Sequence, residues 1–471
     1  MDTKKLRQKI LDLAIHGKLV PQDPNDEPAS VLLERIRAEK EQLIKEGKIK
    51  APKKSKTAGD TSHYQKEWPW ELPKGWEWCK LAEVGTWQSG STPSRGVSSY
   101  YGGTIPWLRT GDLNDGYIMV IPEYITEKAL AETSVKLNPA GSVLIAMYGA
   151  TIGKVGILTF PATTNQACCA CSEFNGISNK YLFYFLISHK EAFIQQGGGG
   201  AQPNISKEII INTPIPIPPE KEQERIVNAI DEWLNLISQV EKAEQDLHIG
   251  IDTCKAKVLD LAIHGKLVPQ DPSDEPAIEL PRRINPNFQP SDNLHYIDNL
   301  PKGWCFSTIG DIFQHNTGKA LNGIDCEGVM LRYITTSNLY WDRFDLSEER
   351  MMPFTEKEQE KCRVQKGDLL VCEGGDIGRS AIWPYNENVM IQNHIHRLRP
   401  RASVSVRFFY YVLYYYKQKG LIGGKGIGIQ GLSSRELDRM VIPVPPVNEQ
   451  HRIVTAIEEK FALLNTIAYC C

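Results

Sequence analysis

The longest regular pattern of apolar positions lies in the middle of the chain. From residue 226 to residue 261, apolar side chains recur at spacings that alternate between four and three residues, and this predicts a helix over residues 222 to about 264. Some ~43 residues rising 1.5 Å each would form a rod of roughly 65 Å. A helix of this length with one apolar seam needs a partner helix. The seam positions are Ile226, Ile230, Trp233, Ile237, Val240, Leu247, Ile251, Cys254, Val258 and Leu261.

The chain also repeats itself. Residues 12–29 (DLAIHGKLVPQDPNDEPA) recur as residues 260–277 with a single change, Asn25 to Ser273, at an offset of 248. The motif LPKGW recurs at an offset of 228, and IPIPPEKEQERIV from Ile215 is matched by IPVPPVNEQHRIV at an offset of 227. The sequence therefore contains two copies of one module and two copies of one connector.

These offsets map the two ends of the chain onto the central helix. We expect the ends, laid nearly end to end, to rebuild a second copy of that helix and to form with it an antiparallel pair that carries one module at each end. Lys460 falls on a seam position and departs from the pattern. A pairing of the seam with another protein is the alternative. The seam positions of the two ends are Leu6, Ile10, Leu13, Ile453, Ile457, Leu464 and Ile467.

Each module has the pattern of a mixed α/β (α+β) domain. Short apolar runs at residues 142–147, 154–160, 368–372 and 380–383 lie between Gly and Pro turns and predict strands of a curved sheet. Residues 181–188 and 406–416 predict helices against it. Gly-rich segments at 195–201 and 423–428 predict loops at equivalent places in the two modules. These loops could approach a ligand or change shape, and the alternative is that they are flexible turns. We predict linkers at residues 45–62 and 281–292. The predicted boundaries are 1–66 (helical region and linker), 67–218 (first module), 219–298 (central helix and linker), 299–446 (second module) and 447–471 (C-terminal helix).

Charge and composition narrow the class of protein. The 471 residues carry a formal charge of -3 with 24% charged residues, which excludes a polycation and a disordered chain. Residues 219–298 alone carry -8, so any contact with nucleic acid is expected on the modules. No run of about 18 apolar residues and no signal-peptide core occurs, which predicts a cytoplasmic protein without a membrane partner. The 11 cysteines need no disulfide framework in that compartment.

The sequence lacks the common catalytic motifs. It contains no GxxxxGK[ST], HExxH or GxSxG segment and no Asn/Asp-Pro-Pro-aromatic motif, so we expect a chain that is not an enzyme and holds no cofactor. Two clusters could suggest a metal, namely Cys168, Cys169 and Cys171 in the first module and His394 with His396 in the second. Neither has a second pair at zinc-site spacing, and the repeat aligns Cys169 with His396. We therefore expect no metal, and buried or ligand-reading residues instead.

The connectors are nearly identical, whereas the modules share only scattered turn and core residues. A constant frame with two unlike modules predicts recognition of a bipartite, asymmetric DNA sequence with an unread spacer. Residues near strand ends are the candidates for contacts with bases and phosphates, since Arg pairs with guanine, Asn with adenine, and Ser, Thr and Lys mostly with phosphate. For each one, an ordinary solvated surface position is the alternative. The candidates are Ser91, Thr92, Ser94, Arg95, Arg109, Thr110, Tyr148, Thr151 and Lys154 in the first module, and Lys319, Arg332, Thr335, Thr336, Asn338, Arg379, Asn393, His394 and Lys425 in the second.

The repeated connector, the LPxGW start of each module and its PxPPxxEQxRIV end resemble the specificity subunit (HsdS) of type I restriction-modification systems. The resemblance covers essentially the whole chain. It implies that residues 68–218 and 300–446 are target recognition domains for double-stranded DNA, and that residues 1–45, 220–280 and 447–471 dock two modification (methyltransferase) subunits. Restriction subunits would join through these partners, and S-adenosylmethionine and ATP with Mg would belong to the partners.

Two other functions remain open at this point. A stand-alone two-site DNA-binding regulator or anti-restriction decoy would bind DNA tightly without partners, which the acidic central segment disfavours. A coiled-coil scaffold whose modules bind proteins or carbohydrate would not retain DNA even when assembled.

Overall fold

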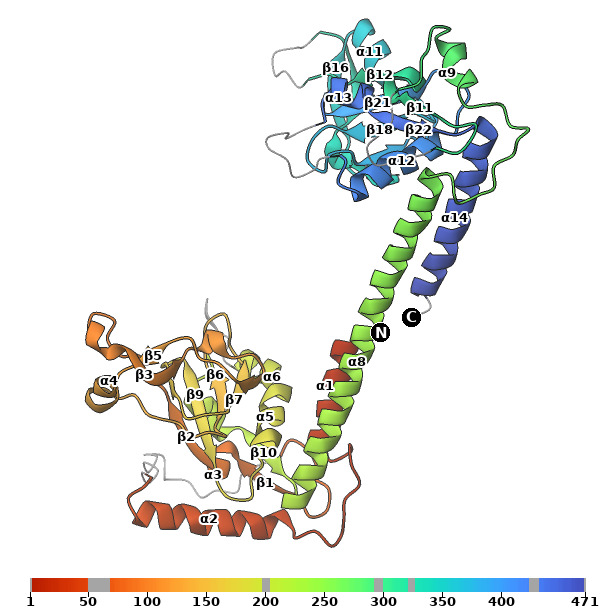
Figure 1. Ribbon diagram of the computed structural model, residues 1–471. Helices are drawn as coiled ribbons and strands as arrows, with labels where there is room; N and C mark the ends of the chain where they lie inside the picture. The colour runs from red at the N-terminus through yellow and green to blue at the C-terminus, as the bar shows by residue number, and fades with distance from the viewer. Residues whose placement is uncertain are drawn as a thin grey trace. The chain divides into compact units, whose positions relative to one another are not determined.

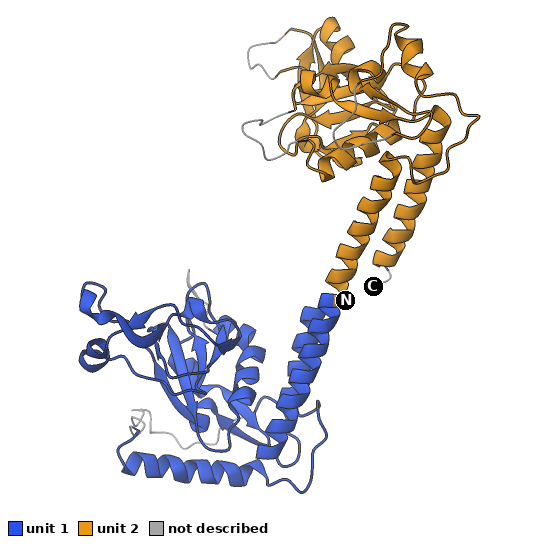
Figure 2. Cartoon of the chain, in the orientation of Figure 1, with its two compact units in different colours: residues 1–242 blue, residues 243–471 orange. Residues whose placement is uncertain are grey.

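The computed structural model describes residues 2–49, 68–196, 204–291, 300–320, 327–422 and 432–469. Its contacts divide the chain into two compact units, residues 1–242 and 243–471 (Figure 2). The boundary falls inside the long helix α8 (Glu220–Ile263), so each unit contains one module and one part of this helix. The predicted central helix at residues 222–264 is thus confirmed to within two residues at each end.

The module of unit 1 is built on an open five-stranded sheet in the order β2-β9-β6-β7-β4 (Figure 1). A second sheet has the order β5-β3-β8, and its strands lie between those of the first along the chain. The strands β1 and β10 pair where the module begins and ends. The strands are β1 (Glu77–Lys80), β2 (Gly85–Ser89), β3 (Tyr101–Leu108), β4 (Gly116–Ile118), β5 (Tyr124–Ile125), β6 (Val143–Ala146), β7 (Val155–Leu158), β8 (Thr163–Thr164), β9 (Cys168–Glu173) and β10 (Pro214–Ile217).

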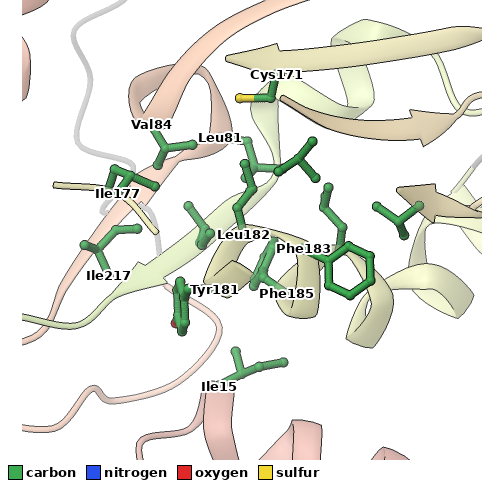
Figure 3. Close-up of a cluster of buried hydrophobic side chains, with 14 of the residues drawn as sticks. Ile15, Leu81, Val84, Cys171, Ile177, Tyr181, Leu182, Phe183, Phe185 and Ile217 are labelled. Atoms are coloured by element: carbon green, nitrogen blue, oxygen red, sulfur yellow. The ribbon is translucent and has the colours of Figure 1, made fainter. Parts of the chain in front are cut away.

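Helices cover this sheet and tie it to the connector. The helix α5 packs on β6 and β7, and it contributes Tyr181, Leu182 and Phe185 to the buried cluster drawn in Figure 3. Ile15 of α1 belongs to the same cluster, so the module and the connector share one core. The helices of this unit besides α8 are α1 (Thr3–Ile15), α2 (Ala29–Lys45), α3 (Leu81–Val84), α4 (Glu127–Glu132), α5 (Asn179–Ser188), α6 (Lys190–Gln196) and α7 (Lys207–Asn212).

The module of unit 2 repeats this plan with different sheets. Four strands follow the order β12-β21-β18-β19, four more follow β16-β13-β20-β17, and β11 pairs with β22 at the module's ends as β1 pairs with β10. The helix α12 (Val406–Gln418) occupies the place of α5, as the sequence predicted. The strands are β11 (Cys305–Thr308), β12 (Phe313–Thr317), β13 (Val329–Ile334), β14 (Leu339–Tyr340), β15 (Arg343–Phe344), β16 (Arg350–Phe354), β17 (Arg363–Val364), β18 (Leu369–Cys372), β19 (Ser380–Ile382), β20 (Val389–Ile391), β21 (Ile395–Pro400) and β22 (Val441–Val444).

The remaining helices of unit 2 are short, apart from α14 at the end of the chain. They are α9 (Glu279–Ile284), α10 (Ile309–Ile312), α11 (Glu356–Cys362), α13 (Ser434–Asp438) and α14 (Val447–Tyr469). Leu280 and Pro281 of α9 are buried, so the predicted linker at residues 281–292 begins as packed helix. Of the linker predicted at residues 45–62, the part from residue 50 onward lies outside the described residues.

An antiparallel helix pair is present within each unit. In unit 1, α1 lies along α8, and Arg7 bonds to Glu241 at 2.8 Å, while Gln22, just beyond α1, bonds to Glu222 at the other end of this stretch. In unit 2, α14 lies along α8, with Ile453 and Ile457 in the same core as Leu259 and Lys255 above the ring of Phe461. In each pair, residue numbers increase along one helix while those of the contacting residues on the other helix decrease, so both pairs are antiparallel.

The predicted seam needs a correction. Ile226, Ile230, Ile237 and Ile251 are buried, but Trp233, Val240 and Cys254 are exposed. The seam is therefore buried at some positions along α8 and exposed at others. Lys460 occupies the position equivalent to Trp233 and is also exposed, so this lysine does not interrupt any buried contact.

No helix in the described part of the chain is long and apolar enough to cross a membrane.

Candidate nucleic-acid interface

In unit 1, several predicted contact residues gather at one edge of the five-stranded sheet. Ser89, the last residue of β2, lies opposite Cys169 near the start of β9, and Ile145 of β6 lies opposite both Cys169 and Val155, the first residue of β7. The loop after β2 and the loop between β6 and β7 therefore leave the sheet at the same edge. We call these two loops, with the loop after β3, the first edge.

The loop after β3 joins this edge through backbone hydrogen bonds. The amide of Ser91 donates to the carbonyl of Thr164 at 2.9 Å, and the amide of Asn165 donates to the carbonyl of Leu108 at 2.9 Å. Arg109 and Thr110, which follow Leu108, are thereby brought beside the loop that starts at Ser91. The sequence alone places these residues only near strand ends; the paired backbone brings them together.

Two arginines of the first edge share one carboxylate. Arg95 lies 3.1 Å and Arg109 2.8 Å from the two oxygens of Glu123, and the guanidinium of Arg95 also stacks over Tyr101 and Trp107. Both arginines remain about half exposed. Two cations with one acid leave a net positive charge, so the pair is held in place and is still able to bond to a phosphate or a guanine.

The other candidates of the first edge differ in exposure. Thr92 and Ser94 are exposed, whereas Tyr148, Thr151 and Lys154 in the turn between β6 and β7 are partly buried. The hydroxyl of Ser91 lies 2.8 Å from that of Ser134, and its carbonyl accepts a bond from the indole of Trp107. Ser91 therefore combines a structural role with its place at the edge.

In unit 2, the equivalent edge is formed around β12, β18 and β21. Thr317 at the end of β12 lies opposite His396, and Cys372 at the end of β18 lies opposite Ile395. The end of β13 joins them because Ile334 pairs with Ile391, just before the turn that leads into β21. We call the loops that follow β12, β13 and β18, with the turn between β20 and β21, the second edge.

Lys319 at this edge is turned into the module. Its ammonium bonds to Glu358 at 2.9 Å and to the carbonyl of Pro353 at 2.9 Å, and the side chain is 8% exposed. Glu358 also caps α11, and the hydrogen bond from Lys319 lowers the pKa of this carboxyl. A cation so fully satisfied by the protein favours a structural role for Lys319.

The loop after β13 is held by its own polar side chains. The amide of Thr335 donates to the side-chain oxygen of Asn338 at 3.0 Å, and the side-chain amide of Asn338 donates to the carbonyl of Asp345 at 2.9 Å; both residues are buried. Thr336 is partly buried, and its carbonyl accepts a bond from Arg379 at 2.7 Å. Thr335 and Asn338 thus shape the loop, while Thr336 and Arg379 lie nearer its surface.

Three further candidates of unit 2 remain accessible. His394 is exposed, 3.3 Å from Glu373, and Asn393 beside it is partly buried. Arg332 lies more than 3.5 Å from two exposed acids, Glu349 and Glu387, so its partners constrain it little. Lys425 lies outside the described residues.

Each edge contains a glycine that no other residue could replace without movement. A Cβ atom on Gly90 would lie 2.2 Å from the carbonyl oxygen of Asn165, and one on Gly318 would lie 2.0 Å from that of Ile391. The backbone after β2 and after β12 therefore runs directly against the neighbouring strand connection.

The repeat reveals positions that the sequence reasoning missed. Gln166 is exposed and stands at the position of Asn393, with an offset of 227 that alone would have pointed to it. Beside it, the side-chain oxygen of Asn165 is buried and has no hydrogen-bond partner among the described residues. In unit 2, Arg343 is exposed and stacks over Tyr340 with 4.4 Å between the guanidinium carbon and the ring centre, but neither residue adjoins a Gly or Pro signal.

The three cysteines of the first cluster and His396 of the second are buried. Cys168, Cys169 and Cys171 lie buried in β9, where burial raises the pKa of the Cys169 thiol to about 12. His396 lies between His315, 2.9 Å away, and the carbonyl of Leu432, to which its Nε2 donates at 2.7 Å; burial lowers the pKa of His396. Within the described ranges, no group of three His, Cys, Asp or Glu side chains could hold a metal ion.

Comparison with known proteins places the chain in a family. The family model of the type I restriction modification DNA specificity domain matches it twice, at residues 73–247 and 301–467. The specificity subunit of the type I restriction enzyme EcoAI of Escherichia coli is 26% identical over 99% of this chain and 90% of its own length. The corresponding EcoEI subunit of the same organism is 27% identical over 98% and 90%.

Solved structures show the same fold. A chain from a study of complex assembly and conformational transition of the type I R-M system superposes with a TM-score of 0.60 at 18% identity, covering 85% of this chain and 94% of that one. The HsdS subunit from Thermoanaerobacter tengcongensis gives a TM-score of 0.54 at 18% identity, covering 85% and 93%.

The repeated modules and these matches define a non-catalytic subunit for DNA recognition. More narrowly, the chain belongs to the specificity subunits of type I restriction-modification systems.

Proposed function

We propose that this subunit reads a split, asymmetric DNA sequence, one half with each module, and that it binds two copies of one modification (methyltransferase) subunit, through which restriction subunits join. The observation that carries this proposal is a contrast between two kinds of exposed surface. The exposed connector turns of the two units are nearly identical, whereas the two edges differ in the side chains that they present.

The connector turns at residues 18–28 and 266–276 illustrate the first half of this contrast. Most of their side chains are exposed, yet only position 25, which corresponds to 273, differs. Their internal bonds also match, since Arg225 lies 2.6 Å from Asp26 and Arg452 lies 2.7 Å from Asp274. Packing within the chain explains why buried residues are the same in both turns, but it does not explain why the exposed residues are the same. The identical exposed residues therefore support the binding of the same partner protein at both turns, one copy at each.

Exposed apolar positions on the helices repeat in the same way. Leu236 and Val240 of α8 correspond to Leu463 and Ile467 of α14 at an offset of 227, and all four are exposed. Trp233 extends the patch in unit 1. Adjacent apolar side chains on an exposed helix face favour the docking of a partner helix. We call these two patches the first and second helix faces.

The two edges support unlike half-sites. Arg95 and Arg109 are exposed at the first edge. At the second edge, by contrast, His394 is exposed and the side chain of Lys319, which corresponds to Ser91, is only 8% exposed. A guanidinium pairs with guanine through two donors, and an imidazole presents a different set of donors and acceptors, so the two edges offer different contacts. Two modules that address one face of B-DNA would favour half-sites about one helical turn, ~34 Å, apart or a multiple of it.

The chemistry of methylation and cleavage is assigned to the partners. We expect S-adenosylmethionine to bind the modification subunits and ATP with Mg to bind the restriction subunits, with no cofactor in this chain. We place its site of action in the cytoplasm, where the DNA of a cell without a nucleus lies.

Single-molecule methylation sequencing tests the proposal. The full chain is expressed with its methyltransferase partner in a host that lacks other methyltransferases, and we expect methylated adenines within one split motif. No methylation with the chain present would contradict the proposal. Tight, salt-dependent binding of DNA by the chain alone would instead favour the stand-alone regulator.

A further inference from the structure

Each unit contains a cavity where its module meets its helices. In unit 1 a cavity of about 370 Å³ lies between α5 and the α1–α8 pair, and in unit 2 one of about 460 Å³ lies between α12 and the α8–α14 pair. Their linings correspond at an offset of 227: Asp115, Lys180, Tyr184 and Asp231 in the first, and Asp342, Arg407, Tyr411 and Glu458 in the second. We call them the first and second junctions.

At the first junction, the module is bonded to α8 through one carboxylate. The ammonium of Lys180, on α5, lies 2.5 Å from Asp231 on α8. The hydroxyl of Tyr184, one turn further along α5, donates to the other oxygen of Asp231. Lys180 also lies over the ring of Tyr117, which belongs to β4. Two side chains of the module helix therefore meet at one acid of the connector helix.

At the second junction, an arginine replaces the lysine and joins two acids. The Nε of Arg407, on α12, donates to Glu458 of α14 at 3.0 Å, and its Nη2 donates to Asp342 of the module at 2.6 Å. The guanidinium lies over the rings of Tyr410 and Tyr411. Because a guanidinium donates along fixed directions in one plane, these contacts fix the angle at which α12 meets α14.

The backbone around each junction is also unusual in the same way. Asp115 and Asp342 have φ values of 56° and 57°, and they are the non-glycine residues with positive φ in the described ranges. Their amides make equivalent bonds, to the carbonyls of Val155 at 3.0 Å and Ser380 at 3.1 Å. A residue other than glycine keeps a left-handed backbone conformation only where the surrounding structure holds it there. Both units hold an aspartate in this conformation at the equivalent position.

We propose that Lys180 and Arg407 are positioning residues that set the orientation of each module on its connector helices and, through it, the spacing at which the two half-sites are read. The proposal rests on the proposed function, since it concerns the length of the unread spacer. The apolar core beneath each junction stabilises the contact between module and helices but does not fix its angle, because the hydrophobic effect is non-directional. A charge-assisted hydrogen bond, by contrast, has a preferred geometry. Loss of that bond leaves the module folded and attached but free to adopt a wider range of angles.

Two substitutions on the connector helices test this assignment without altering a module. Glu458→Gln in unit 2 and Asp231→Asn in unit 1 remove the charge that each module cation meets, while keeping the side-chain volume. Glu279→Gln is the matched control, because Glu279 forms an exposed ion pair with Arg282 within α9, away from both junctions. Arg407→Lys is the conservative variant, since lysine performs this role in unit 1.

The measurement is methylation by the full chain with its methyltransferase partner, on duplexes whose half-sites match the wild-type motif and whose spacers are one base pair shorter, equal or longer. We expect Glu458→Gln and Asp231→Asn to lower the preference for the correct spacer about five- to tenfold, with the half-site bases and the melting temperature unchanged. Glu279→Gln should keep the full preference and Arg407→Lys most of it.

Unchanged spacer preference in both variants would overturn the positioning role. Equal loss of methylation at every spacer length, together with a lowered melting temperature, would also overturn it. That result would mean that the junction stabilises the fold and does not set the orientation of the module. A wild-type complex that methylates no split motif would refute the proposed function itself, and this outcome is distinct because it appears before any substitution is made.

Discussion

The two helix faces lead to a prediction about stoichiometry. Leu236 is 50% and Leu463 64% exposed, so a docked partner would bury half or more of each side chain. Full burial of a leucine contributes about 1.5–3 kcal/mol, which gives roughly 1–2 kcal/mol for the part exposed here. A glutamate in its place would bring a carboxylate into an apolar contact at a further cost of several kcal/mol. Leu236→Glu or Leu463→Glu should therefore weaken binding of one partner by at least ~100-fold.

Native mass spectrometry of the chain mixed with its methyltransferase partner measures this effect. Wild type should carry two partners, each single variant one, and the double variant none. Because both leucines are already exposed, the melting temperature of the isolated chain should stay unchanged. Asn235→Glu is the control, since Asn235 is exposed on α8 away from the first helix face. Two partners retained by the double variant would refute the docking of partners on these faces.

Two further predictions concern stability. Burial raises the pKa of Glu173 from 4.5 to about 7, so its stabilising protonated form is fully present below pH ~4 and is lost as the pH rises through about 7. The free energy of unfolding of Glu173→Gln should therefore rise relative to that of wild type between pH 5 and pH 8, by up to roughly 3 kcal/mol. Urea unfolding of both proteins at pH 5 and at pH 8 measures this, and the same difference between them at the two pH values would contradict the prediction. Gly318→Ala places a Cβ 2.0 Å from a backbone oxygen and should destabilise unit 2 by about 2–3 kcal/mol. Gly374→Ala, whose Cβ would have no described atom within 4 Å, should not, and calorimetry measures both.

The architecture was predictable because repetition and periodicity are properties of the sequence itself. The central helix was placed within two residues, and the strands at 142–147 and 368–372 correspond to β6 and β18. The burial of individual seam positions was less predictable. Trp233 fits the same spacing as Ile237, and spacing does not distinguish an apolar side chain packed within the chain from one left exposed for a partner.

The candidate site depended on contacts that are distant in the sequence. That Lys319 meets Glu358 and that Arg95 and Arg109 share Glu123 follows from how the loops fold against each other. The left-handed Asp342 gave no signal either, because aspartate is common in ordinary turns. Gln166 could have been found, since the repeat aligns it with Asn393.

Exchange of the second module shows whether each module reads its half-site independently of the other. Residues 299–446 are replaced by the corresponding module of a relative with a different motif, and the methylated sequence is determined for the parent and the chimaera with the same partner subunits. We expect one half of the motif to change while the other half and the spacer length stay the same. A change in both halves, or in neither, would show that the two modules do not each read one half-site.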